Sequence, residues 1–194
     1  MPPKVRFAKE QITQAALAVV SQKGVQALTA KELGTALGTS TTPIFTVFSS
    51  MQEVHDTVKD AAMAKFEEYA DKLEPSQPIF KQVGMQMILF AKEEPKLYQF
   101  LFMSPNEDAQ NFDDIYCRIG PTATECIRVI GQEYGLNVAD AKVLFEHVWI
   151  HTFGIGTLCA AGMCNFSVEK IFEMLSEDFI AMMMLIKSGK QNLK

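Results

Sequence analysis

The chain has 194 residues, a length that suits one medium-sized domain or a small head followed by a larger body. Apolar residues make up 48 % of the sequence, which is ample for a buried core. The net charge of −5 excludes the strongly basic balance that is typical of non-specific nucleic-acid binders. The N-terminus is polar and no apolar run is expected to span a bilayer, so we predict a cytoplasmic protein without a membrane segment.

Two helices are predicted at the N-terminal end. Apolar residues repeat at helical spacing over residues 12–20, and Gly24 follows shortly after them. Thr29 can cap a second helix, and Glu32 stands three residues later, which is the spacing of a capping box. Gly38 then occupies the position where a left-handed residue is favoured, so the second helix is expected to end there.

A third helix is predicted directly after this turn. Ser40 would be its N-cap, and Pro43 would lie in its first turn, where a missing N–H does no harm. Ile44, Phe45 and Phe48 would form its apolar face. Two short helices joined by a glycine turn are typical of a helix-turn-helix, which lays its second helix in the major groove of DNA.

The rest of the sequence also predicts helices. A second capping box at Ser50 and Glu53 starts a helix over residues 51–73, which the proline-containing stretch 74–78 ends. Later apolar stripes predict helices over residues 79–91, 95–102, 115–130, 139–161 and 168–187. No strand alternation is found, so the predicted fold class is all-α, with about nine helices. We place a three-helix head at residues 1–50 and a larger helical body at residues 51–194.

The N-terminal stretch resembles the TetR family of bacterial transcriptional regulators over about residues 8–58. The matching residues are Ile12, Ala15, Ala16, Leu17, Gly24, Leu28, Thr29, Leu33, Leu37, Gly38, Ser40, Ile44, Phe45, Phe48 and Ser50. The body, at residues 90–100 and 149–158, is similar to one subgroup of that family. The resemblance implies a homodimer whose heads bind a palindromic double-stranded DNA operator, most often as a repressor. It also implies a body that binds a small-molecule effector and dimerises.

Three positions depart from the pattern of this family. Gly34 stands where Ala is usual, Phe45 where Tyr is usual, and Met51 where Lys is frequent. The last two changes remove a hydroxyl and a cation that would be directed at phosphate. DNA affinity is therefore expected to be weaker or to depend on other groups.

The candidate DNA-binding residues lie in and around the second and third helices. Thr41, Thr42 and Thr46 are predicted to touch base edges or phosphates, because a hydroxyl donates or accepts and a Thr methyl can meet a thymine methyl. Ordinary capping is the alternative for Thr41 and Thr42, and core packing is the favoured alternative for Phe45. The full set is Arg6, Thr29, Lys31, Ser40, Thr41, Thr42, Pro43, Phe45 and Thr46.

The body is rich in Met and aromatic residues, which suit a pocket for an apolar or aromatic effector. An ordinary core is the alternative for each of these residues. Such an effector would act by favouring one spacing of the heads over another. The candidate pocket residues are Met87, Phe90, Tyr98, Phe102, Tyr116, Trp149 and Phe153.

The last two helices are the candidate dimer interface. The final helix carries a broad apolar stripe, and small residues in the helix before it would allow a partner to approach closely. A helix pair packed inside one chain is the alternative reading of the same pattern. The candidate residues are Gly156, Leu175, Phe179, Met182, Met183 and Ile186.

A metal site and an enzyme are the alternatives to a regulator. His147 and His151 are four residues apart and could face one metal, for which Glu146 and the cysteines are the candidate third ligands. No third ligand is evident and the HExxH order is absent, so we predict no metal or other cofactor and a polar role in lining a pocket instead. An enzyme would need His151 paired with Cys117 or Cys126, and no nucleophile elbow or phosphate loop supports it. The four cysteines form no CxxC pair and are predicted to be free thiols. The remaining alternative is a helical ligand- or metal-binding protein of the same fold with weak or lost DNA binding.

Overall fold

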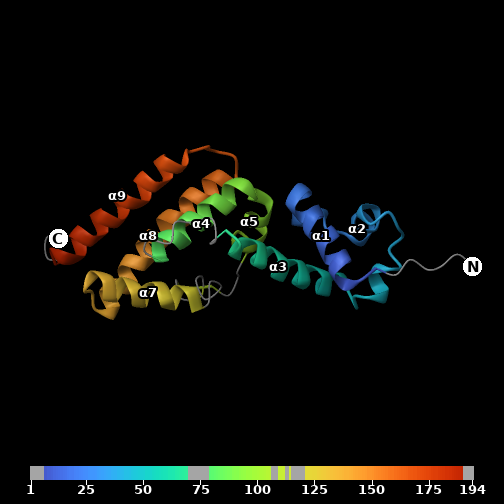
Figure 1. Cartoon of the computed structure of the whole chain (residues 1–194), viewed down its shortest axis with the longest axis horizontal. Coiled ribbons are helices and arrows are strands. Elements are labelled where there is room, and N and C mark those ends of the chain that lie inside the picture. The colour runs from blue at the N-terminus through green and yellow to red at the C-terminus, as the bar shows by residue number, and fades with distance from the viewer. Residues whose placement is uncertain (1–6, 70–78, 106–108, 112–113, 115–120, 190–194) are drawn as a thin grey trace, which may run out of the picture.

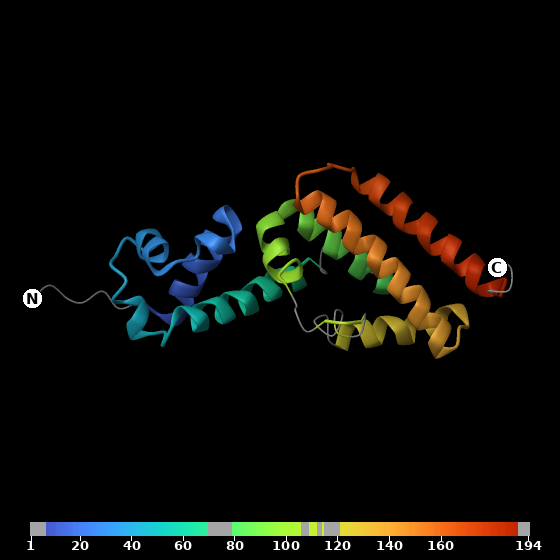
Figure 2. The same cartoon turned by 180° about the vertical axis from the view of Figure 1, so that it is seen from behind.

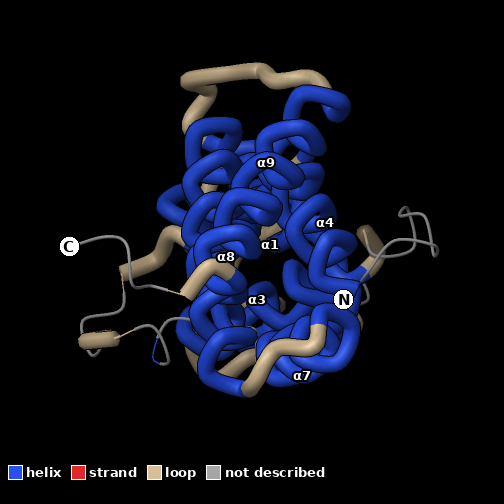
Figure 3. Tube along the Cα trace, turned by 90° about the vertical axis from the view of Figure 1, so that its left-hand side faces the viewer, coloured by secondary structure: helices blue, strands red, loops and turns tan. Residues whose placement is uncertain are grey.

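The computed structural model describes residues 7–69, 79–105, 109–111, 114 and 121–189. Every regular element in these ranges is a helix (Figure 3), which confirms the all-α prediction. The α-helices are α1 (Lys9–Lys23), α2 (Ala30–Ala36), α3 (Met51–Glu67), α4 (Ile79–Glu93), α5 (Pro95–Phe102), α7 (Pro121–Tyr134), α8 (Val138–Ala160) and α9 (Val168–Lys187). Two 3-10 helices, η1 (Val25–Ala27) and η2 (Ile44–Thr46), belong to the N-terminal head.

The molecule is elongated, with the head at one end and the body at the other (Figures 1 and 2). Helix α3 leads out of the head and reaches the body beside α5. The apolar face of α1, with Ile12 and Val20 fully buried, packs on α2 and α3. Ile44 and Phe48 close the same core from the far side of the turn.

The turn after α2 forms as predicted, but the helix after it does not. Gly38 has φ +66°, and the Thr39 amide donates to the Gly34 carbonyl at 2.9 Å. Ser40 caps no helix, and the predicted third helix is reduced to the single turn of η2. The run of hydroxyl and β-branched residues over 39–42 explains this difference, because such residues lose side-chain freedom in a helix or compete for its backbone hydrogen bonds.

Helix α8 lies at the centre of the body and contacts α4, α5, α7 and α9. By length and composition alone it is long and apolar enough to cross a membrane, which the sequence analysis did not expect. In the structure, its residues Leu144 and Ile155 are buried among the neighbouring helices. Part of the apolar surface of α8 is therefore used in packing the body.

One predicted helix end needs correction. Helix α3 ends at Glu67 rather than at residue 73, and residues 70–78 lie outside the described part. Of the helix predicted over residues 115–130, residues 115–120 lie outside the described part, and the remainder belongs to α7. Gly135, with φ +65°, lies in the turn that follows α7.

The head and body meet at the corner between α4 and α5. The carboxylate of Glu94 accepts hydrogen bonds from the Lys65 ammonium of α3 at 2.5 Å and from the Ser21 hydroxyl of α1 at 2.8 Å. Nearby, the Tyr69 hydroxyl donates to Glu93 at 2.9 Å. One acidic corner of the body therefore holds the far end of α1, a head helix, and the far end of α3, the helix that leads out of the head.

Candidate nucleic-acid interface and body cavities

The segment 40–46 forms an exposed surface on the head. Ser40, Thr41, Thr42 and Thr46 are exposed and Pro43 is partly exposed. Beneath this segment, Ile44 is fully buried and Phe48 is 1 % exposed. Because these two apolar anchors belong to the same buried core as residues of α1 and α3, the turn is held in place while its hydroxyl side chains are presented to solvent.

Phe45 departs from the favoured expectation of core packing. Its side chain is 46 % exposed, whereas its neighbour Ile44 is fully buried. In the tight turn of η2 adjacent residues point in different directions, so only one of them can reach the core. Phe45 is accordingly available for contact with a partner.

The hydroxyl groups of this region are not equivalent. Thr29 Oγ1 accepts from the Glu32 amide at 3.2 Å, which confirms the predicted cap of α2. Thr46 Oγ1 donates to the Pro43 carbonyl at 2.7 Å and can then only accept from a partner. Within the described residues, Thr41 and Thr42 make no side-chain hydrogen bond, so the capping alternative does not account for them.

The cations of the head differ in their partners. Lys9 pairs with Glu53 at 3.1 Å, and Lys23 pairs with Glu32 at 2.5 Å. Lys31 is exposed and has no carboxylate partner in the part of the chain that the structure describes. Arg6 lies outside the described residues. Exposed ion pairs are weak, so phosphate groups can compete for the paired lysines as well.

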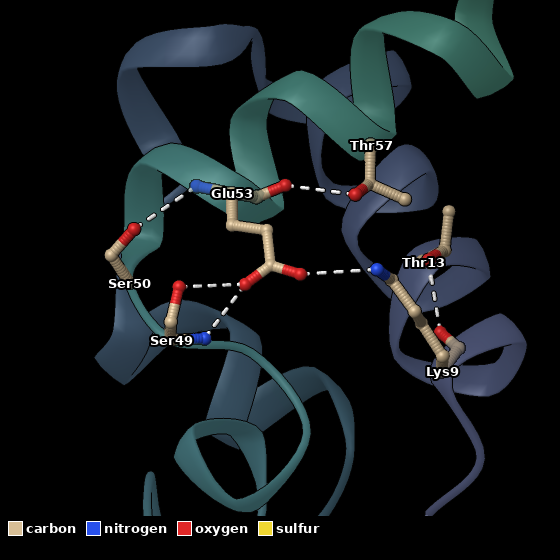
Figure 4. A network of polar contacts seen from close by, with 6 residues as sticks. All are labelled: Lys9, Thr13, Ser49, Ser50, Glu53 and Thr57. Atoms are coloured by element: carbon tan, nitrogen blue, oxygen red, sulfur yellow. Dashed lines mark hydrogen bonds and ion pairs between the residues drawn. The ribbon is translucent and has the colours of Figure 1, made fainter.

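Glu53 connects the end of the exposed segment to α1 and α3 (Figure 4). One carboxylate oxygen accepts from the Ser49 amide and hydroxyl, both at 2.8 Å, and the other accepts from the Lys9 ammonium at 3.1 Å. The Ser49 amide, the Ser49 hydroxyl and Lys9 lower the pKa of Glu53 from 4.5 to about 2. The Glu53 amide donates to Ser50 Oγ at 3.2 Å, as predicted, but the carboxylate binds Ser49 rather than Ser50.

This network was missed in the sequence analysis. The two adjacent serines, Ser49 and Ser50, were a local signal for part of it, because either serine can hydrogen-bond to the Glu53 carboxylate. Lys9 is 44 residues away from Glu53 in the chain, so no local sequence pattern indicates that the two side chains pair.

Gly34 allows the turn to lie close against α2. A Cβ atom at this position would stand 3.0 Å from the Thr39 carbonyl oxygen and 3.4 Å from the Ser40 carbonyl carbon. Both atoms belong to the backbone that starts the exposed segment. Gly34 is therefore matched to the path of this particular turn.

The predicted pocket residues pack mostly against one another. Phe90 and Tyr98 are fully buried, and Tyr98 lies 5.2 Å from Phe102 and 6.3 Å from Phe153 between ring centroids. Trp149 stacks on Phe153 at 5.1 Å. Burial raises the pKa of the Tyr98 hydroxyl. These rings form an aromatic cluster that fills its own space, and Tyr116 lies outside the described residues.

Two small cavities lie instead around Gly84, Val148 and Thr152, with about 310 Å³ and 340 Å³ of non-atom space including their mouths. The first lies between α4, α8 and α9, and its remaining lining residues are Lys81, Met85, Phe172, Leu175 and Ser176. The second lies between α4, α7 and α8, and its remaining lining residues are Val83, Met87, Cys126, Phe145 and Trp149. Of the predicted pocket residues that the structure describes, Met87 and Trp149 line the second of these cavities, and the others line neither of the two.

The histidine pair lines neither cavity. His147 is exposed, and His151 Nδ1 lies 3.8 Å from Asp178 Oδ1 across the contact between α8 and α9. His151 Nε2 and Asp178 Oδ2 are buried, and neither atom has a hydrogen-bond partner in the part of the chain that the structure describes. Among the described residues, no three His, Cys, Asp or Glu side chains are grouped as a metal site.

The predicted dimer residues face the interior of the single chain. Leu175, Phe179 and Met183 are buried, and Met182 and Ile186 are partly buried against a core cluster to which α7, α8 and α9 contribute. Gly156 is also buried. Tyr98 packs closely against it, since a Cβ atom at position 156 would lie only 2.6 Å from the Tyr98 hydroxyl oxygen.

A different set of apolar side chains is exposed on the last two helices. Its members, at 39–68 % exposure, are Ile150 and Leu158 of α8 and Phe172, Ile180 and Met184 of α9. The sequence does contain a signal for this face, because residues 150, 154 and 158 of α8 and residues 180 and 184 of α9 are apolar or small and recur every four positions.

Comparison with known proteins gives a limited result. No family model matches the sequence, and no curated protein matches it. Among solved structures, the chain is similar to the crystal structure of Mycobacterium smegmatis AmtR, at 14 % identity and a TM-score of 0.42, over 91 % of this chain and 96 % of that one. A likeness at this level carries no conclusion about function, so the function must be argued from the arrangement of the residues of this chain.

Proposed function

We propose that the protein is a DNA-binding transcriptional regulator whose head contacts a double-stranded operator through residues 40–46. The observation that carries the proposal is the exposed row of Thr41, Thr42 and Phe45 held in place by buried Ile44 and Phe48. Hydroxyls can contact base edges and phosphates, and an exposed ring can meet a thymine methyl. Lys31 and the helix start at Thr29 supply a cation and backbone amides for phosphate.

The proposal extends to a homodimer that pairs through α8 and α9. Ile150 and Leu158 of α8 lie on the same side of their helix as Gly154, where a Cβ would meet nothing within 4 Å. Together with Ile180 and Met184 of α9, they form an apolar surface that one chain leaves uncovered. A two-fold dimer would present two heads to the half-sites of a palindromic operator.

The proposed division is a DNA-binding domain over residues 1–50 and an effector-binding and dimerisation domain over residues 51–194, in a cytoplasmic protein that is not an enzyme. The effector would enlarge the cavities around Gly84, which touch the core of α4, α8 and α9. Because α4 ends at the Glu94 corner, movement of α4 would reach Ser21 of the head and Lys65 of α3, the helix that leads out of the head. Release from the operator by the effector makes the protein a repressor.

Selection of bound fragments from genomic DNA, followed by gel-shift titration at modest ionic strength, tests the proposal. The double variant Thr42→Ala with Thr46→Ala is expected to weaken specific binding about tenfold or more, since each lost base contact is worth about 1–3 kcal/mol. Thr124→Ala is the matched control, because Thr124 is also an exposed threonine on a helix but lies in the body. Unchanged operator affinity in the double variant, or binding of no fragment by the parent protein, would refute the assignment.

The second candidate is a ligand-binding protein of this fold with weak or lost DNA binding. The reduction of the third helix to one 3-10 turn and the pairing of Lys9 and Lys23 with carboxylates favour it. The variant Phe45→Tyr with Met51→Lys distinguishes the two candidates. It should strengthen a weak binder several-fold, whereas a protein without base contacts would gain only binding that ignores sequence.

A further inference from the structure

Two cysteines meet where α8 ends. Cys159 lies in the last turn of α8 and Cys164 lies in the connection to α9, and their sulfur atoms are 3.8 Å apart. A disulfide bond is about 2.05 Å long, so the sulfurs need to approach by less than about 2 Å. Neither cysteine is used by the proposed DNA interface or by the cavities.

The backbone brings these two sulfurs together. Helix α8 stops at a glycine turn, in which Gly162 has φ +70° and the Met163 amide donates to the Leu158 carbonyl at 3.0 Å. This hydrogen bond reverses the chain and returns Cys164 to the last helical turn. The contact is therefore imposed by the end of the helix and does not require a rearrangement of the fold.

The two thiols differ in access. Cys159 is 8 % exposed, whereas Cys164 is partly exposed. Burial, followed by the neighbouring Cys164, raises the pKa of Cys159 to about 11. A reagent from solvent therefore meets Cys164 first, and Cys159 is placed behind it as the second reactant.

We infer that Cys159 and Cys164 are a site of reversible modification, at which a small-molecule disulfide oxidises the pair to a disulfide bond within one chain. The thiolate of Cys164 attacks one sulfur of the reagent, forms a mixed disulfide and releases the first small thiol. Cys159, after losing its proton to solvent, attacks the sulfur of Cys164 and releases the second small thiol. Two protein thiols lose two electrons, and the reagent gains them as its disulfide becomes two thiols.

The bond would join α8 to the connection that leads into α9. That connection is already held to α4, because the Lys92 ammonium donates to the Phe166 carbonyl. The last turn of α8 is held to α5, because the Gln99 side-chain amide donates to the Ala160 carbonyl at 2.8 Å. The disulfide would therefore stiffen the end of the body that lies next to α5 in Figures 1 and 2. This inference does not depend on DNA binding.

Treatment of the full-length protein with excess oxidised glutathione, then alkylation and tryptic digestion, tests the inference. No lysine or arginine stands between Lys142 and Lys170, so one peptide carries only these two cysteines. The expected peptide is unalkylated and lighter by two hydrogens, and reduction should restore both thiols. Two alkylated cysteines in that peptide, or a bond from either of them to Cys117 or Cys126, would overturn the inference.

Single variants test the order of the two steps. Cys159→Ala should retain one glutathione on Cys164, because the resolving thiol is missing. Cys164→Ser should leave Cys159 largely unmodified on the same time scale. In the parent protein, the rate of ring closure should rise about tenfold per pH unit below the pKa of the buried thiol. Preferential labelling of Cys159, or a closure rate that does not change with pH, would contradict the proposed sequence.

Discussion

The exposed segment of the head and the aromatic cluster of the body use similar residue types in opposite ways. In the head, Phe45 is 46 % exposed because two neighbouring side chains already anchor the turn. In the body, Phe90 and Tyr98 are fully buried because other rings surround them. The chemistry of an aromatic side chain therefore does not decide whether it binds a partner. Its neighbours in three dimensions decide that.

The largest expected effect separates two adjacent residues of the head. Ile44→Ala should lower the free energy of unfolding by about 2–5 kcal/mol, because Ile44 is fully buried. Phe45→Ala should change it by only about 0.5 kcal/mol, because Phe45 is half exposed. Denaturant unfolding followed by circular dichroism measures both values. Equal losses for the two variants would show that Phe45 belongs to the core after all.

The second prediction concerns the close contact of α5 with α8. Gly156→Ala should destabilise the protein by about 1–3 kcal/mol, because its Cβ would lie 2.6 Å from the Tyr98 hydroxyl. Adding Tyr98→Phe removes that oxygen and should recover part of the loss. The measurement is the unfolding midpoint of both single variants and the double variant. Additive losses would mean that the hydroxyl is not the obstacle.

A smaller effect is expected at the corner between head and body. A double-mutant cycle on Lys65 and Glu94, each replaced by Ala, should give a coupling energy of about 1 kcal/mol, since this pair is partly buried. The matched cycle on Lys170 and Glu173, an exposed pair three residues apart on α9, should give about 0.3 kcal/mol. Thermal unfolding of the seven proteins, the parent and three variants for each cycle, measures both. Similar coupling energies in the two cycles would show that the Lys65–Glu94 pair stabilises the protein no more than an exposed ion pair does.

The smallest effect is a pH dependence in the head. The pKa of Glu53 is lowered to about 2 in the folded state, so its contribution to stability is present above the unfolded value near 4.5 and is lost as the pH falls toward 2. Glu53→Gln should therefore be less stable than the parent protein at pH 5, and the difference between the two free energies of unfolding should shrink as the pH falls toward 2. Unfolding curves at several pH values between 5 and 2 measure the change. A difference that stays constant over this pH range would show that the ionised carboxylate of Glu53 does not stabilise the folded state.

Much of the fold could be predicted because its signals are local. Helical spacing of apolar residues located α1, α4, α8 and α9, and the caps at Thr29 and Ser50 are visible as short motifs. Gly38 marked the turn because only a left-handed residue suits it. The length of the third helix was wrong, since the weak helix propensity of residues 39–42 outweighed the cap signal at Ser40.

The sequence by itself determined the helical class, the order of helices and the hydroxyl-rich segment after the glycine turn, because each depends on residues within a few positions of one another. Only the tertiary structure decided which face of α9 is buried, since Phe179 and Ile180 both continue apolar stripes and the neighbouring helices cover just one. It also decided that Tyr98 fills space beside Gly156 instead of lining a pocket. Burial is a property of what surrounds a side chain, and residues distant in the chain supply those surroundings.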